Sequence, residues 1–124
     1  GFGISQILPL IVQSLVAKNQ TITIEQPEVH IHPGLQANMG DLFAEAIGGS
    51  NNNRFIIETH SEHLVLRMQK LIREGTLKPE DVSVVFVSRS EEGSQVTPLP
   101  LDEDGDFTEE WPGGFFPERM NELF

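Results

Sequence analysis

The stretch that decides the fold spans residues 21–34 and reads TITIEQPEVHIHPG. Residues 21–25 are a β-branched run that ends on a carboxylate, which predicts a buried strand. Pro27 ends that strand, because proline cannot donate a hydrogen bond to a neighbouring strand. Residues 33–34, Pro-Gly, then open a helix whose apolar residues recur at helical spacing as far as residue 46.

The same alternation of strand and helix extends in both directions from this stretch. Periodicity and turn residues predict a helix at 5–16, a strand at 54–58, a helix at 61–73, a strand at 82–89 and a shorter strand around Val96. Ser61 is a candidate N-cap and Gly75 a C-terminal stop for the third helix. The order predicts an α/β fold, with a sheet that is parallel in its middle and antiparallel at one edge.

The composition excludes several classes of protein. The chain has 124 residues, no Cys and no apolar run long enough to span a bilayer. These features argue against a disulfide framework and a thiolate metal site, and they fit a cytoplasmic protein. The net charge of -11 argues against nucleic-acid binding by this chain alone. Residues 102–124 carry eight acidic residues and one Arg, so most of the negative charge lies in the tail.

Polar side chains gather where the first two predicted strands end. Glu25, Gln26, Glu28, His30 and His32 follow the first strand, and Glu58, Thr59, His60 and Ser61 follow the second. Ligands of open α/β sheets bind at the carboxyl ends of the strands, so both sets are expected within reach of one ligand. Carboxylates suit Mg²⁺, and a histidine can donate a hydrogen bond to a phosphate.

These motifs resemble those of ABC-type P-loop ATPases of the OLD, RecF and SMC kind. Residues 22–33 look like the extended Walker B strand and D-loop, and residues 58–61 look like the switch-histidine loop. Residues 1–6, GFGISQ, are similar to a degenerate signature loop. The segment WPGGFF at 111–116 resembles a C-terminal domain of unknown function found in a bacterial branch of these ATPases. The resemblance implies the second half of an ABC-type P-loop NTPase domain in residues 1–100, followed by an acidic, aromatic tail in 101–124.

The resemblance also implies roles for individual residues. Glu25 would support Mg²⁺, through water, as the Walker B acid, and His60 would contact the γ-phosphate of ATP. His30 and His32 would belong to a D-loop that crosses to a partner subunit in a head-to-tail homodimer. Gly3 and Ser5 would bind the γ-phosphate of a nucleotide held by that subunit.

Two departures from the family pattern bear on catalysis. The residue after the Walker B acid is usually a Glu that acts on the attacking water, and here it is Gln26, which cannot accept a proton. Hydrolysis would then be slow, or Glu28 or another group would act as the base. The chain also contains no Gly-rich loop ending in Gly-Lys-Ser or Gly-Lys-Thr. We therefore expect the phosphate-binding loop in a missing N-terminal half, and little ATPase activity from this chain alone.

Other functions are compatible with the same residues. In the full protein, the resemblance implies ATP hydrolysis coupled to DNA handling or phage defence. A second hypothesis is a non-catalytic interaction module with a decayed ATPase face, which Gln26 favours. A third is a metal-dependent hydrolase that uses the four His residues, although their spacing matches no closed zinc site.

Overall fold

The computed structural model describes residues 2–114 of the chain, apart from the side chains of residues 2–4 and 6. The chain divides into two compact units, Gly1–Arg67 and Met68–Phe124. We call them the sheet unit and the hairpin unit and describe each by itself.

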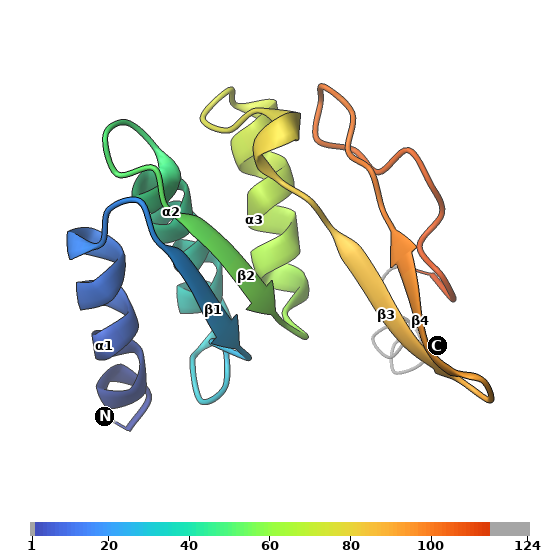
Figure 1. Ribbon diagram of the computed structural model, residues 1–124, viewed down its shortest axis with the longest axis horizontal. Coiled ribbons are helices and arrows are strands. Elements are labelled where there is room, and N and C mark those ends of the chain that lie inside the picture. The colour runs from blue at the N-terminus through green and yellow to red at the C-terminus, as the bar shows by residue number, and fades with distance from the viewer. Residues whose placement is uncertain (1, 115–124) are drawn as a thin grey trace. The chain divides into compact units, whose positions relative to one another are not determined.

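The sheet unit contains a parallel pair of strands with helices between and before them (Figure 1). In chain order, its elements are α1 (Phe2–Val16), β1 (Thr21–Glu25), α2 (Pro33–Ile47), β2 (Arg54–Glu58) and the first part of α3 (Glu62–Arg73). The strands pair in parallel from Thr21 beside Arg54 to Glu25 beside Glu58. A parallel pair requires a crossover connection, which α2 supplies.

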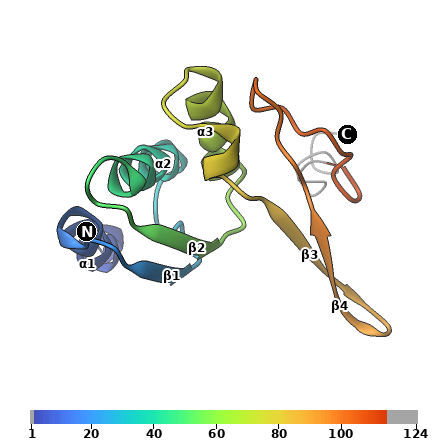
Figure 2. The same ribbon diagram turned by 45° about the horizontal axis from the view of Figure 1, so that its top comes forward.

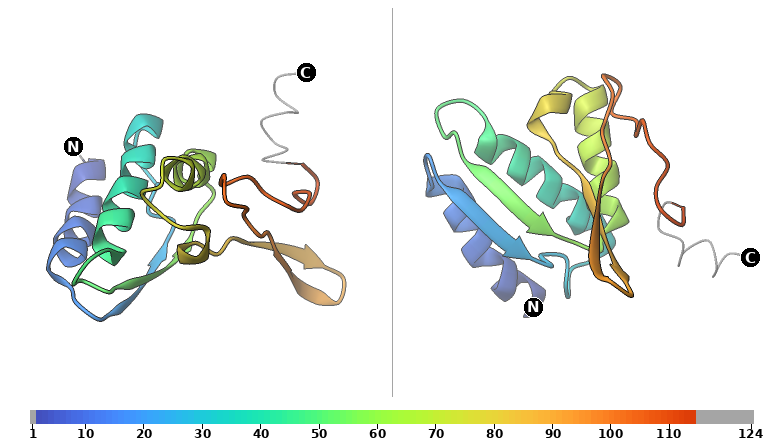
Figure 3. Two further views of the ribbon diagram at one scale, coloured as in Figure 1. Left: turned by 90° about the horizontal axis from the view of Figure 1, so that it is seen from above. Right: turned by 45° about the vertical axis from the view of Figure 1, so that its right-hand side comes forward.

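One face of the β1–β2 pair is covered, and α1 and α2 both lie on that side (Figure 3). Ile22 of β1 is buried, and so are Met39 and Phe43 of α2. The rings of Phe43 and Phe55 lie 5.0 Å apart, so α2 packs directly on β2. On the opposite face, Ile56 is 63% exposed. The alternation of strand side chains therefore gives the pair one core face and one open face.

A buried asparagine joins the two helices of the sheet unit to the strands. Asn53 is only 4% exposed. Its Nδ2 donates hydrogen bonds to Ala17 O at 2.8 Å and to Ala46 O at 3.0 Å. Its Oδ1 accepts a hydrogen bond from Gln20 N at 3.2 Å. Ala17 follows α1 and Ala46 lies in the last turn of α2, so Asn53 satisfies carbonyls that helix ends leave unpaired.

The hairpin unit contains the end of α3, a 3₁₀ turn η1 (Pro79–Asp81) and the antiparallel strands β3 (Val85–Ser90) and β4 (Gly93–Pro98), which Figure 2 shows side by side. Helix α3 ends at Arg73, and Gly75, two residues later, has a φ of +77°. Gly75 N donates to Ile72 O and Thr76 N donates to Leu71 O, both at 2.9 Å. These two bonds define a Schellman motif, so the predicted glycine stop is confirmed.

After β4, an aspartate turn and an aromatic cluster complete the hairpin unit. Asp102 Oδ1 accepts hydrogen bonds from the backbone of Asp104 and Asp106, both at 2.9 Å. The Trp111 ring packs edge-on against Phe86 at 5.7 Å and Phe107 at 5.3 Å. The expected docking of the aromatic tail is therefore observed for Trp111, whereas Phe115 and Phe116 lie outside the described residues.

The α/β class, the parallel pair and the antiparallel hairpin are confirmed. The described strands form two separate two-stranded sheets. Two predicted boundaries were wrong. Helix α1 begins at Phe2 instead of Ser5, and β3 begins at Val85 instead of Val82, since residues 82–84 between η1 and β3 form no regular element. No helix in the described part of the chain is long and apolar enough to cross a membrane.

Candidate functional site

The carboxyl end of the β1–β2 pair carries two adjacent carboxylates. Glu25 and Glu58 are register partners, and both are exposed on the open face. Gln26 N donates to Glu58 O at 2.8 Å, which extends the pairing one residue beyond β1. Cα partners on neighbouring strands are about 5 Å apart, so the two carboxylates belong to adjacent residues on one face of the pair. Oxygen donors of this kind suit Mg²⁺, which proteins commonly bind through one or two carboxylates plus phosphate and water.

A compact turn at residues 26–32, the post-β1 turn, follows directly. Val29 N donates to Gln26 O at 3.2 Å and Ile31 N donates to Glu28 O at 3.0 Å. Gln26 and His30 have positive φ values of 46° and 67°, which are uncommon for residues with a side chain. Both are strained conformations that the surrounding turn imposes, as is frequent at functional sites.

The loop at residues 59–61, the post-β2 loop, is tied to this turn through Glu28. Glu28 Oε1 accepts a hydrogen bond from His60 N at 2.6 Å, across 32 residues of sequence. Glu28 Oε2 is buried and has no partner among the described residues. His60 is exposed and follows β2 by two residues. An imidazole donor and two carboxylates therefore lie at the carboxyl ends of adjacent strands.

Gln36 of α2 makes a second connection between the same two segments. Its Nε2 donates to Ile31 O at 2.9 Å, and its Oε1 accepts a hydrogen bond from Ser61 Oγ at 2.7 Å. Ser61 Oγ in turn accepts from Leu64 N at 3.1 Å, which confirms Ser61 as the N-cap of α3. The buried Ser61 hydroxyl is fully engaged, and this arrangement gives no support to a nucleophile role.

The other residues singled out from the sequence lie in helices α1, α2 and α3 or at their ends. His32 Nδ1 accepts a hydrogen bond from Gly34 N at 3.2 Å and so caps α2, while its place in a subunit interface stays a prediction. Gly3 and Ser5 lie within the first turns of α1. His63 lies in the first turn of α3, and its Nε2 is 3.9 Å from a carboxylate oxygen of Glu62.

Gln36 is a site residue that the sequence reasoning missed, and Glu58 was named only as part of the strand-end set and the switch-loop segment. Glu58 occupies the last position of its strand, as Glu25 does, and that equivalence was a usable signal. Gln36 had none, because only the packing of α2 brings it to both loops.

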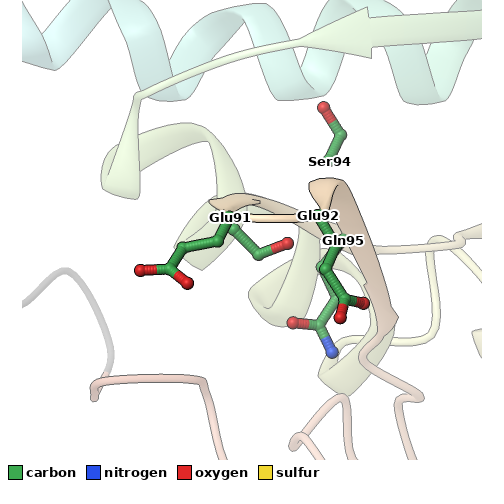
Figure 4. A pocket seen from close by; sticks show the side chains of 5 residues that line it. Glu91, Glu92, Ser94 and Gln95 are labelled. Atoms are coloured by element: carbon green, nitrogen blue, oxygen red, sulfur yellow. The ribbon is translucent and has the colours of Figure 1, made fainter.

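Other polar groups in the described chain form no comparable site. Residues 2–114 contain no group of three or more His, Asp or Glu side chains placed to bind a metal ion. The third hypothesis, a hydrolase built on the His residues, therefore has no cluster to support it in that range. An open hollow at the β3–β4 turn is lined by polar side chains of Ser90, Glu91, Glu92, Ser94 and Gln95 (Figure 4). It has no basic or imidazole group, so it lacks the mixed donors found at the strand ends.

Comparison with known families agrees with the geometry. A family model described as "AAA ATPase domain" matches residues 1–65, which contain both strand ends and both loops. The chain belongs to the AAA ATPase domain family. This family consists of nucleotide-binding ATPases with a P-loop NTPase fold, so the edge that carries Glu25 and His60 is part of an ATPase domain. A second model, of a protein family of unknown function (DUF3696), matches residues 77–124. No curated protein and no solved structure matches the chain significantly.

Proposed function

We propose that this AAA ATPase chain is the C-terminal half of an ABC-type domain that binds and hydrolyses ATP with Mg²⁺. The observation that carries the proposal is the parallel register that sets Glu25 beside Glu58 next to the His60 loop. In this reading, residues 22–33 are the Walker B strand and D-loop, and residues 58–61 are the switch loop.

Glu25 and Glu58 are the residues that would hold Mg²⁺, directly or through water. The ion would neutralise charge on the β- and γ-phosphates when bound. His60 would donate a hydrogen bond to the γ-phosphate, where negative charge must be stabilised during transfer. Gln26, at the end of β1, would orient the attacking water, although its amide cannot take the proton.

The phosphate-binding loop would come from an N-terminal half, and the exposed apolar surface of the sheet unit supports such a partner. Leu8, Val12, Leu15 and Val16 of α1 are each more than half exposed. Leu8, Val12 and Leu15 recur at helical spacing and so form one apolar face, which is uncovered within the sheet unit. Ile56, on the open face of β2, is a further apolar group available to such a partner.

Several wider features of the proposal rest on the resemblance. The full protein would form a head-to-tail homodimer, with His30 and His32 at the interface and Gly3 and Ser5 facing the partner's nucleotide. It would act in the cytoplasm, on DNA or in phage defence, through regions outside this chain. The competing candidate is a non-catalytic interaction module, and Gln26 is the residue that favours it.

The test uses the full-length protein that contains this chain. Glu25→Ala is expected to weaken Mg²⁺-dependent ATP binding and to lower turnover by about 10³-fold, because several kcal/mol of charge stabilisation are lost. His60→Ala is expected to keep binding but lower turnover by about 10²-fold. His63→Ala is the matched control, since this histidine lies in α3 and has no role in the proposed site. Wild-type turnover in both the Glu25 and the His60 variant would show that this edge does not catalyse hydrolysis and would favour a decayed face that serves as an interaction module.

Two further measurements sharpen this test. Gln26→Glu in the full-length protein is expected to leave binding unchanged and to raise turnover by restoring a proton acceptor beside the water. The isolated chain is expected to bind Mg-ATP only weakly in a calorimetric titration, because it lacks the phosphate loop. A micromolar dissociation constant would mean that the nucleotide site lies elsewhere.

A further inference from the structure

Two hydrogen-bonded ties join the post-β1 turn to the post-β2 loop. The first is the single bond from His60 N to Glu28 Oε1 at 2.6 Å. The second runs from Ile31 O through the Gln36 amide to Ser61 Oγ, with lengths of 2.9 and 2.7 Å. The first tie is made by the main-chain N of His60 and the second by the side chain of the next residue, Ser61. The main chain that carries the imidazole is therefore held at two neighbouring residues.

The first tie changes the role that Glu28 can have. A general base must present a free lone pair to the water that it deprotonates. Oε1 of Glu28 accepts the short bond from His60 N, and Oε2 is buried away from solvent. Neither oxygen is therefore presented to a water at the exposed edge where Glu25 and Glu58 lie. A carboxylate that accepts a main-chain N–H at such a distance makes a strong, charge-assisted bond.

We propose that Glu28 is a positioning residue, which fixes the His60 main chain and thereby the place of the imidazole. This inference rests on the proposed function of His60 as the phosphate contact. It also makes the position of His60 depend on the conformation of the post-β1 turn, because Glu28 belongs to that turn. A displacement of the turn by a bound partner is thus transmitted to the imidazole through one hydrogen bond.

The positioning role and the base role predict opposite behaviour for Glu28→Gln. The amide oxygen of Gln can accept the bond from His60 N at the same reach, but the amide cannot accept a proton from water. Asp is one methylene shorter and cannot reach His60 N without moving the turn. Alanine removes the acceptor altogether and leaves the His60 N–H without its partner.

The experiment measures steady-state ATP turnover of the full-length protein with Glu28→Ala, Glu28→Asp and Glu28→Gln. We expect Ala and Asp to lower kcat about 10- to 100-fold at nearly unchanged KM, as for loss of one hydrogen bond to a charged group. The kcat of Glu28→Gln is expected to be at least tenfold higher than that of Glu28→Ala. Glu28→Ala added to His60→Ala should lower kcat little further, because both act through one imidazole. Glu45→Gln, an exposed carboxylate change on α2, is the control.

A result in which Gln is as inactive as Ala, with the acidic limb of the pH–rate profile removed, would show that Glu28 is the base and overturn the proposal. A second readout is independent of ATP turnover. In this chain, hydrogen exchange of the His60 amide should be at least tenfold faster in Glu28→Ala than in Glu28→Gln. Equal exchange in the two variants would show that the tie is absent. Protected exchange in a protein without ATPase activity would refute the proposed function but keep the tie.

Discussion

The sheet unit and the hairpin unit differ in what their polar side chains do. All four His residues lie in the sheet unit, which has six acidic and three basic residues. The hairpin unit has 13 acidic and five basic residues, most of them on its surface. In the sheet unit, Asn53, Glu28 and Gln36 each connect segments that are distant in sequence. In the hairpin unit, Gln69 and Arg73 connect α3 to the turn at residues 102–106, and aromatic rings make a further connection.

The sheet unit contains the residues that match the ATPase family model. Ordering polar groups away from water is costly, and a fold maintains such an arrangement where each group has a partner. The sheet unit uses these groups to hold two loops beside a pair of carboxylates. The hairpin unit combines ring packing with polar contacts from α3, and its acidic residues are mostly exposed. Substitutions in each unit test whether this contrast holds.

The largest effect on stability is expected from Gly105→Ala in the hairpin unit. Gly105 has a φ of +78°, and a Cβ there would lie 2.6 Å from Gln69 O. Backbone strain and overlap together should lower the free energy of unfolding by about 3 to 4 kcal/mol. Urea unfolding followed by fluorescence of Trp111, the single Trp of the chain, measures it. Gly75→Ala is the control, because its φ is also positive but no atom lies within 4 Å, so a loss of about 1 kcal/mol is expected. Equal losses would mean that the close approach to α3 is unimportant.

The next largest effect is expected from Asn53→Ala in the sheet unit. This change leaves Ala17 O, Ala46 O and Gln20 N without their partner and should cost about 2 to 3 kcal/mol. Hydrogen exchange should accelerate in β1 and β2 but not in β3 and β4 if the two units unfold separately. Asn38→Ala, an exposed change on α2, should stay within about 0.5 kcal/mol of wild type. Equal acceleration of hydrogen exchange in all four strands would show that the two units do not unfold separately.

The smallest effect is expected from Arg73→Ala. Arg73 Nη2 lies 2.7 Å from Asp106 Oδ1, but the two side chains are 55% and 63% exposed. Surface ion pairs contribute little because water screens them, so the expected change is about 0.5 kcal/mol or less. The midpoint of urea unfolding, followed by Trp111 fluorescence at low and at high salt, measures this change in stability. A loss above about 1.5 kcal/mol would show that charge, as well as ring packing, stabilises the hairpin unit.

Local sequence was sufficient to predict most elements of the fold. The β-branched run of β1, the spacing of Met39, Phe43 and Ala46 in α2, and the Gly75 stop are short-range signals, and all three were confirmed. The predictions failed at positions where burial or strand pairing depends on contacts with segments distant in sequence. Leu35 has the spacing of the α2 core residues but is 51% exposed. Residues 82–84 have strand-like side chains, but β3 begins only at Val85.

The sequence by itself determined that two strands end on carboxylates and that a histidine loop follows the second. Periodicity, β-branching and turn residues act over a few positions, so a single chain shows them. The tertiary structure decided that Glu25 stands beside Glu58 and that Glu28 binds the His60 main chain 32 residues away. Strand register and loop contacts depend on how α2 packs across β1 and β2. In our proposal, that packing gives Glu28, one of the bases considered from the sequence, the role of holding a histidine in place.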